Sequence, residues 1–364
     1  MGNDAGKRVV VVGAGIVGAS LAYHLAGQGA QVTLVEGECI ASGVTGRSFA
    51  WINTSHSGPD PVAALRGAAI QEYRRLETEL PELKVRWTGA LSYGVPPDES
   101  PAVSHPPSTS QVSRAQILEL EPNLKHPPRQ ALFAAEEGAL DAVQATHALI
   151  AGAEAHGAKV LTQTRVLGFI TQGAKVTGLE TAKGPIEADL VVLAAGTGIS
   201  QLTETLNLPL PIAASPSIFI RYQARPDLVR TLISNPAMEV RQGAGSQLLA
   251  AEDYLDDTPE NQPTAIALRT ARAIQDELHG VTSIVPEVAC IGLRPIPVDG
   301  RPIVGYLPGI AGVYVCVMHP GVTLAAIVGR LASEEIVHDE AASALGPCRP
   351  ERFFQDQGPL CKKH

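Results

Sequence analysis

The chain has 364 residues, of which 45% are hydrophobic and 18% charged, so it can fill a core and form about two domains of ~150 residues each. The net charge of −9, with no block of Lys or Arg, argues against a nucleic-acid partner, which would need positive charge to neutralise phosphates. Five cysteines form no Cys-x-x-Cys pair, which argues against a disulfide scaffold or a metal site. We therefore expect a cytoplasmic protein.

The first predicted element is a strand over residues 7–12, a run of valines typical of a strand buried on both faces. The glycine-rich turn GAGIVG (13–18) follows, and then a helix over residues 16–28 that ends at Gly29. A second strand, residues 31–36, completes a βαβ unit. Because three glycines interrupt the apolar run, we expect neither a signal peptide nor a membrane span.

This G-x-G-x-x-G turn lies between a strand and a helix, which is the context that predicts a dinucleotide site. Gly13 permits the tight turn, Gly15 lets the backbone approach a pyrophosphate, and Gly18 lets the helix pack closely on the strand. The helix N-terminus offers free N–H groups to phosphates. Glu36 ends the second strand, where a carboxylate accepts hydrogen bonds from the adenosine ribose and repels a 2′-phosphate. The motif disfavours NADP but does not distinguish FAD from NAD.

Beyond residue 36 the order of elements departs from that of a plain NAD dehydrogenase, which would continue with alternating strands and helices. The remaining predicted elements are a Gly/Ser-rich loop (37–48), a helix capped by Asp60, a helix capped by Asp141, strands over 158–162, 165–171, 174–181 and 188–195, antiparallel strands over 216–223, 237–242 and 246–251, a helix over 263–279, strands over 288–294 and 312–317, and a helix over 322–338. We expect little structure after residue 340.

Five segments resemble the D-amino acid oxidase, glycine oxidase and sarcosine oxidase family of FAD-dependent amine oxidoreductases. They are the βαβ unit (9–36), SGVTGRSF (42–49), the Asp141 helix with its following strands, LAAGTG (193–198), and residues 292–336, which begin GLRPIPVDGRPIVG. These segments cover most of the expected flavin domain, whereas the intervening segments match only in general pattern. The resemblance is specific for the superfamily and not for a substrate.

The resemblance implies an α/β fold with a discontinuous, Rossmann-like FAD-binding domain and an α+β substrate domain built on an antiparallel sheet. We expect residues 1–80, 140–200 and 285–340 in the FAD-binding domain, 81–139 and 201–284 in the substrate domain, and 341–364 in a C-terminal tail.

The same resemblance implies which residues bind FAD. The loop after the second strand wraps the cofactor, the backbone of Val166 meets the adenine, and the N-terminus of the last helix stabilises negative charge on the reduced flavin. The expected FAD-binding residues are Gly13, Gly15, Ile16, Val17, Gly18, Glu36, Thr45, Gly46, Arg47, Ser48, Val166, Ala195, Gly196, Gly292, Arg294, Gly321, Val322 and Thr323. For Arg47 the alternative is a surface ion pair.

Two positions separate the chain from sarcosine oxidases. Those enzymes tether FAD to a cysteine near the region of Cys290, but alignment on the Asp299 turn puts Gly292 at that place, so we expect non-covalent FAD. A lysine of sarcosine oxidases corresponds to Thr323 here, which shifts the resemblance toward glycine oxidase.

Arg294 is the residue expected to bind the substrate carboxylate, through the planar fork of its guanidinium. The alternative is a structural arginine. His319 and His56 are candidates near the flavin, where a cation would favour oxygen reduction, although loop histidines with structural hydrogen bonds fit equally. Tyr254 and Arg241 are weaker candidates from the substrate sheet, and Arg241 would hold a second carboxylate.

The implied reaction is oxidation of the C–N bond of glycine or an N-substituted glycine such as sarcosine or iminodiacetate. Arg294 binds the carboxylate, a hydride passes from Cα to flavin N5, the imine hydrolyses, and O2 reoxidises the flavin to give H2O2. Two alternatives stay open: a D-amino acid dehydrogenase that passes electrons to a quinone or protein acceptor, and an accessory flavoprotein subunit. Homo-oligomerisation also stays open.

Overall fold

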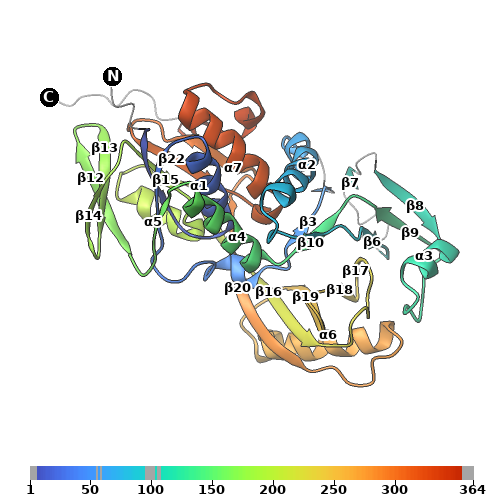
Figure 1. The fold of residues 1–364 in the computed structure, drawn as a ribbon. Coiled ribbons are helices and arrows are strands. Elements are labelled where there is room, and N and C mark those ends of the chain that lie inside the picture. Colours follow the sequence, from blue (N-terminus) through green and yellow to red (C-terminus); the bar gives the residue numbers. More distant parts are fainter. Residues whose placement is uncertain (1–5, 55, 58–59, 95–102, 105–107, 355–364) are drawn as a thin grey trace.

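The computed structural model describes residues 6–54, 56–57, 60–94, 103–104 and 108–354. A six-stranded sheet forms the centre of the first part of the fold (Figure 1). Its strands, in spatial order, are β11 (Lys159–Leu161), β2 (Gln31–Val35), β1 (Arg8–Val12), β15 (Leu190–Leu193), β22 (Val313–Val317) and β21 (Ile303–Tyr306). All run parallel except β21. Segments from the start, middle and end of the chain thus meet in one sheet, which confirms the predicted discontinuous Rossmann-like fold.

The valine run of β1 is buried on both faces of this sheet, as predicted. Val9 and Val11 pack against the helices on one face, and Val10 and Val12 pack against the opposite layer. The helices are α1 (Ile16–Gly27), α4 (Ala142–Ala155) and α7 (Gly321–His338). The opposite layer contains β12 (Val166–Gln172), β13 (Lys175–Thr181), β14 (Gly184–Glu187) and α5 (Ile199–Glu204).

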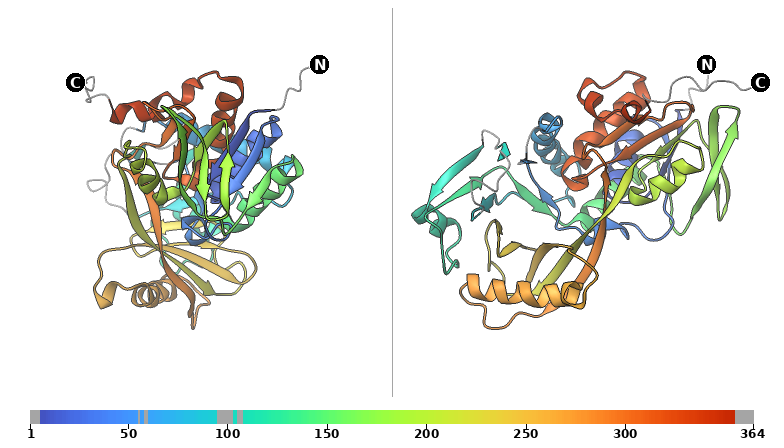
Figure 2. Two further views of the ribbon diagram at one scale, coloured as in Figure 1. Left: turned by 90° about the vertical axis from the view of Figure 1, so that its left-hand side faces the viewer. Right: turned by 180° about the vertical axis from the view of Figure 1, so that it is seen from behind.

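An eight-stranded sheet forms the second part of the fold (Figure 2). In spatial order its strands are β20 (Pro286–Pro297), β16 (Ile212–Gln223), β19 (Gln247–Asp253), β18 (Met238–Gln242), β17 (Leu232–Asn235), β6 (Ala90–Ser92), β9 (Gln130–Ala134) and β8 (Thr109–Ser113). Neighbours are antiparallel except β17 and β6. One face packs on α6 (Pro263–Glu277). Residues 286–297 belong to this sheet by hydrogen bonding, and the predicted domain boundaries stay a prediction.

Shorter elements complete the described chain. They are α2 (Ala63–Glu79), α3 (Arg114–Leu120), β3 (Trp51–Ile52), β4 (His56–Ser57), β5 (Val85–Arg86), β7 (Val103–Ser104), β10 (Gly138–Leu140), and the 3-10 turns η1 (Val44–Arg47), η2 (Gly196–Gly198), η3 (Pro259–Asn261), η4 (Ser343–Cys348) and η5 (Pro350–Phe353).

Asp141 caps α4 as predicted, because its Oδ1 accepts the N–H groups of Val143 and Gln144, both at 2.9 Å. Asp60 is not the cap of α2, which begins at residue 63. Its carboxylate instead accepts the N–H of Val62 at 2.9 Å and pairs with Arg66 at 2.7 Å, so it braces the segment just before the helix.

The segment after residue 340 is not the weakly structured tail that we expected, as far as residue 354. Leu345 and Cys348 are fully buried in the core that contains α7. Arg352 binds Asp299, with Nε 2.8 Å from Oδ2, and this pair fastens η5 to the turn before β21. Residues 355–364 lie outside the described part.

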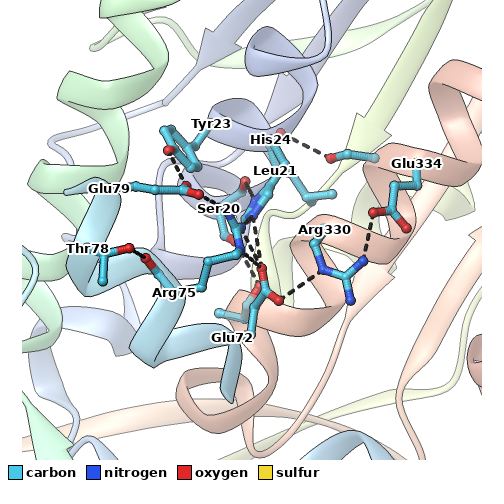
Figure 3. Close-up of polar contacts among 12 residues, drawn as sticks. Ser20, Leu21, Tyr23, His24, Glu72, Arg75, Thr78, Glu79, Arg330 and Glu334 are labelled. Carbon is cyan, nitrogen blue, oxygen red and sulfur yellow. Dashed lines mark hydrogen bonds and ion pairs between the residues drawn. The ribbon is translucent and has the colours of Figure 1, made fainter. Parts of the chain in front are cut away.

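A buried ionic cluster ties α1, α2 and α7 together (Figure 3). Glu72 of α2 binds Arg75 at 2.5 Å and Arg330 of α7 at 2.9 Å. Arg75 also donates to Nε2 of His24 in α1 at 2.9 Å. Burial alone would raise the pKa of Glu72, but the hydrogen bonds and charges of these neighbours lower it to about 2. The carboxylate therefore stays charged and links three helices.

Candidate active site

A cavity of about 1370 Å³ lies between the carboxyl ends of the parallel strands and the open face of the eight-stranded sheet. Val12, Val35 and Ala194 line it at the ends of β1, β2 and β15. Open α/β sheets bind ligands in this place. The volume exceeds the ~300–1,000 Å³ of ordinary small-molecule pockets, so the cavity has room for a dinucleotide and a second small molecule.

The glycines of the first turn have the structural roles predicted for a dinucleotide site. Gly13 has φ +105°, and a β-carbon on it would lie 2.6 Å from the carbonyl oxygen of Ala194. A β-carbon on Gly18 would lie 1.9 Å from the carbonyl oxygen of Gly13, so α1 packs directly on the turn. Gly15 lines the cavity, whereas Gly18 supports it from behind.

The N-terminus of α1 opens into this cavity without a side-chain cap. Ile16 donates its N–H to Oγ1 of Thr45 at 3.2 Å. The N–H groups of Val17 and Gly18 have no hydrogen-bond partner among the described residues. Free N–H groups at the positive end of a helix dipole bind phosphate.

Glu36 lies at the end of β2, in the wall of the cavity. One carboxylate oxygen accepts the N–H of Ala14 and the other that of Glu38, both at 2.8 Å. These bonds fix the carboxylate beside the glycine turn, where an adenosine ribose lies when a dinucleotide occupies such a fold.

The loop over residues 42–48 forms the side of the cavity. Arg47 is exposed to the cavity and has no ion pair among the described residues, which leaves its charge available for an anionic ligand. Gly46 faces Ala41 instead, because a β-carbon on Gly46 would lie 2.6 Å from that residue's carbonyl oxygen. Gly292 packs against Arg47 and Val44. Gly46 and Gly292 therefore shape the loop but do not line the cavity.

Ser48, Val166, Ala195 and Gly196 also line the cavity, and their contact with FAD stays a prediction. Ser48 accepts the N–H of Ala50 through its Oγ at 3.0 Å, which holds the backbone at the cavity wall.

The N-terminus of α7 meets the same cavity from the opposite side. Gly321 and Val322 line it, and Pro320 provides no side-chain cap. Thr323 does not line it, because its buried hydroxyl donates to the carbonyl of Trp51 at 3.2 Å and also contacts Asn53. Thr323 thus fastens α7 to β3, and its position relative to the cavity differs from the sequence expectation.

Arg294 extends from β20 into the cavity wall. Its Nη2 donates to Oγ of Ser215 at 3.1 Å and to the carbonyl of Pro216 at 3.3 Å. Its buried Nε has no partner. No carboxylate of the described chain pairs with this guanidinium. Asp299, which follows Arg294 by five residues, binds Arg352 instead. The guanidinium of Arg294 is therefore a cation without an anionic partner among the described residues.

His319 lies beside this arginine in the cavity wall. Burial, together with the charges of Arg294 and Arg66, lowers the pKa of His319 to about 4. This low pKa favours a neutral imidazole near pH 7, and a role for His319 in catalysis stays a prediction.

Two other candidates, Tyr254 and Arg241, are absent from the described lining of the cavity, and a third, His56, is not described there. The hydroxyl of Tyr254 donates to Asp257, and the ring packs on the core beneath α6. Arg241 is buried and donates to the carbonyls of Phe49 at 2.6 Å and Leu140 at 2.9 Å, so it holds the wall in place and is not a second carboxylate anchor. His56 lies in β4, but its side chain is outside the described part.

The sequence analysis missed Glu239 of β18 and Phe219 of β16, which both line the cavity. The alternation of polar and apolar residues along β18 was the available signal, since it marks residues 239 and 241 as one face. Alternation alone does not say which face meets the cavity.

These features fit a dinucleotide cofactor and an anionic substrate. Two uncapped helix N-termini, the fixed carboxylate of Glu36 and the unpaired charge of Arg47 surround one end, and Arg294 stands at the other. Among the described residues no cluster of three His, Cys, Asp or Glu can hold a metal ion. Within the same ranges no helix has the length and hydropathy to cross a membrane. The fold and site define a dinucleotide-dependent oxidoreductase.

The FAD dependent oxidoreductase family (DAO) matches residues 8–335, and the chain belongs to this family. The glycine oxidase of Pseudomonas aeruginosa is 27% identical over 367 residues, covering 90% of this chain and 94% of that protein. This protein is accordingly an FAD-dependent amine or amino-acid oxidoreductase.

Solved structures show the same fold. The iminodiacetate oxidase of Chelativorans sp. BNC1 superposes with a TM-score of 0.80 at 21% identity, covering 94% of this chain and 99% of that one. The L-amino acid deaminase of Proteus vulgaris, without its specific insertion, gives a TM-score of 0.85 at 20% identity, covering 96% of this chain and 94% of that one.

Proposed function

We propose that this protein oxidises the C–N bond of a small amino acid or N-substituted glycine and passes the electrons to O2, giving H2O2. The observation that carries this proposal is Arg294, whose guanidinium lies in the cavity wall and has no carboxylate partner among the described residues. Names of relatives support it, since they include glycine oxidase and iminodiacetate oxidase.

Arg294 binds and orients the substrate in this proposal. Its Nη1, which makes no hydrogen bond with the described residues, donates to a carboxylate, which fixes the neighbouring Cα. The contacts with Ser215 and Pro216 hold the guanidinium in place before substrate arrives. Bound FAD supplies the hydride acceptor.

The other groups at this end set the electrostatics. The free N–H groups of Val322 and Thr323 direct partial positive charge at the cavity from the start of α7. Neutral His319 adds no second cation beside Arg294. Its low pKa makes it a poor base, so we assign amine deprotonation to solvent.

We also propose that FAD is bound without a covalent link to the protein. Gly292, at the place of the tethering cysteine, carries no nucleophile. Cys290 is absent from the described cavity lining, and burial raises the pKa of its thiol. Acid precipitation should therefore release all of the flavin into the supernatant, and flavin retained in the washed pellet would contradict this.

Oxygen uptake by the purified flavoprotein tests the reaction. Glycine, sarcosine and iminodiacetate should each be tried, with peroxide and the carbonyl product measured in parallel. We expect stoichiometric peroxide, and catalase should return half of the oxygen consumed. Rapid reduction of an artificial dye with little peroxide would instead identify a dehydrogenase.

A further inference from the structure

Glu239 belongs to the sheet face that lines the cavity. In the register of the sheet it lies opposite Ala251, which lies opposite Phe219, and all three line the cavity. Ser215, four residues before Phe219 on β16, lies opposite Arg294. Because side chains alternate along a strand, Arg294 and Glu239 are on the same face.

The carboxylate of Glu239 lacks a cationic partner in the described chain. Its carboxylate accepts a long, weak hydrogen bond from Oγ of Ser234 at 3.5 Å. Burial and the nearby carboxylates of Glu252 and Asp253 raise the pKa of Glu239 to about 7, although Ser234 and Arg294 act in the opposite direction. A buried carboxylate without a cation is costly, and a cationic ligand group would relieve that cost.

Apart from the charge of Arg294, the nearby charges on the described residues do not compensate Glu239. Glu252 also lines the cavity and is itself a carboxylate, and its Oε1 accepts the hydroxyl of Thr270 on α6 at 2.7 Å. Asp253 lines the cavity and adds negative charge there. Arg241, two residues along β18, is committed to backbone carbonyls. This end of the cavity is therefore acidic, whereas the Arg294 end is basic.

The two ends are far apart for a molecule as small as glycine. Arg294 and Glu239 are three strands apart across the sheet, about 14 Å, and four residues apart along it, about 13 Å, at ordinary sheet spacings. The two long side chains shorten this separation. The backbone positions of the two residues are therefore much farther apart than the two charges of glycine, which are one carbon apart.

We propose that Glu239 is a specificity-determining residue that binds a cationic group at the far end of the substrate, so that preferred substrates are amino acids with a cationic side chain or glycines with a cationic N-substituent. Arg294 holds the carboxylate of the same molecule. This inference rests on the proposed function, because it assumes that Arg294 is the carboxylate anchor.

Binding of an unreactive pair of ligands to the FAD-loaded protein tests the inference directly. Pentanoate and 5-aminopentanoate share a carboxylate and chain length, lack an α-amine, and differ in a distal ammonium group. Calorimetry should give about tenfold tighter binding of 5-aminopentanoate, equivalent to ~1.4 kcal/mol. Glu239→Gln should reduce this ratio to about one. The exposed Glu180→Gln is the control and should keep the ratio.

Equal binding of the two ligands by the unmodified protein, or an unchanged ratio in Glu239→Gln, would overturn the inference. If Glu239→Gln does not retain flavin, the comparison of the two ligands in the unmodified protein decides.

Anaerobic flavin reduction separates this inference from the proposed function. Ornithine and lysine should reduce the flavin at least tenfold more efficiently than norvaline and norleucine, with both enantiomers tested. If charged and neutral amino acids reduce it equally, the inference fails and the proposed function stands. If no amine reduces it but the ligand ratio holds, the proposed function fails and the cation subsite stands.

Discussion

Gly18 and Gly13 approach each other so closely that a β-carbon on Gly18 would lie 1.9 Å from the carbonyl oxygen of Gly13. This contact holds the uncapped end of α1 against the cavity. Any side chain at residue 18 must displace the helix from the strand, and with it the free N–H groups that face a phosphate.

Gly18→Ala should therefore weaken FAD binding at least tenfold and lower stability by about 1–3 kcal/mol, as expected for overpacking. Flavin titration of the apoprotein and thermal unfolding measure the two effects. Gly67→Ala is the matched control, since a β-carbon on this residue in the second turn of α2 has open space around it. It should stabilise by about 0.5–1 kcal/mol. Normal flavin content in Gly18→Ala would contradict the packing argument.

Glu36→Gln should lower the affinity for FAD about tenfold, because the charged acceptor that faces the ribose is lost while the side chain keeps its shape. Quenching of flavin fluorescence during titration of the apoprotein measures this. Glu180→Gln, an exposed substitution on β13, should bind FAD normally. Equal dissociation constants for the two variants would remove Glu36 from the cofactor site.

Glu72→Gln should destabilise the protein by about 2–4 kcal/mol at pH 7, because the variant leaves Arg75 and Arg330 without their shared anion. Glu334→Gln is the control. Glu334 also binds Arg330 but is 41% exposed, so its loss should cost about 0.5 kcal/mol or less.

The contribution of Glu72 to the free energy of unfolding also depends on pH, and it should decrease on acidification. The folded pKa is about 2, below the ordinary 4.5, so the charged carboxylate favours the folded state. Its contribution, about 3 kcal/mol from this shift, is complete above about pH 5 and declines as the pH falls toward 2. Urea unfolding at pH 7 and 3.5 should show a smaller difference between Glu72→Gln and the unmodified protein at the lower pH. A difference that grows on acidification would contradict the assignment.

Leu345→Ala should cost about 2–5 kcal/mol, because this side chain is fully buried in the core with α7. The same change at Leu268, which is 49% exposed on α6, should have little effect. Denaturant unfolding of both variants measures the difference. A small effect at Leu345 would mean that η4 is not part of the folded core.

The parts of the fold that were predicted correctly are those that a sequence pattern of a few residues specifies. The valine run of β1, the glycine turn and the Asp141 cap each specify local geometry, and the structure confirms them. The packing of η4 in the core depends on partners that are distant in the sequence, such as α7, so no local sequence pattern predicts it.

Residues of the candidate site also differ in whether the sequence predicts their role. The loop and strand-end residues that line the cavity follow from the motif, whereas the roles of sheet residues depend on register. Arg241 and Glu239 are two residues apart on β18, yet one is bonded to Phe49 and Leu140 and the other faces the cavity. Strand alternation groups them on one face, and only tertiary packing separates their roles.

Anaerobic reduction of the bound flavin tests most directly whether Arg294 orients an amino acid for oxidation in this cavity. A panel of amino acids and N-substituted glycines should bleach the visible flavin absorbance of the unmodified protein. Arg294→Gln should lower the efficiency of that reduction by about 100-fold, as expected for loss of a charge-assisted contact of about 3 kcal/mol. Arg272→Gln, on the exposed side of α6, should behave as the unmodified protein. Reduction by dithionite but by no amine, or equal rates in Arg294→Gln, would contradict the proposed role.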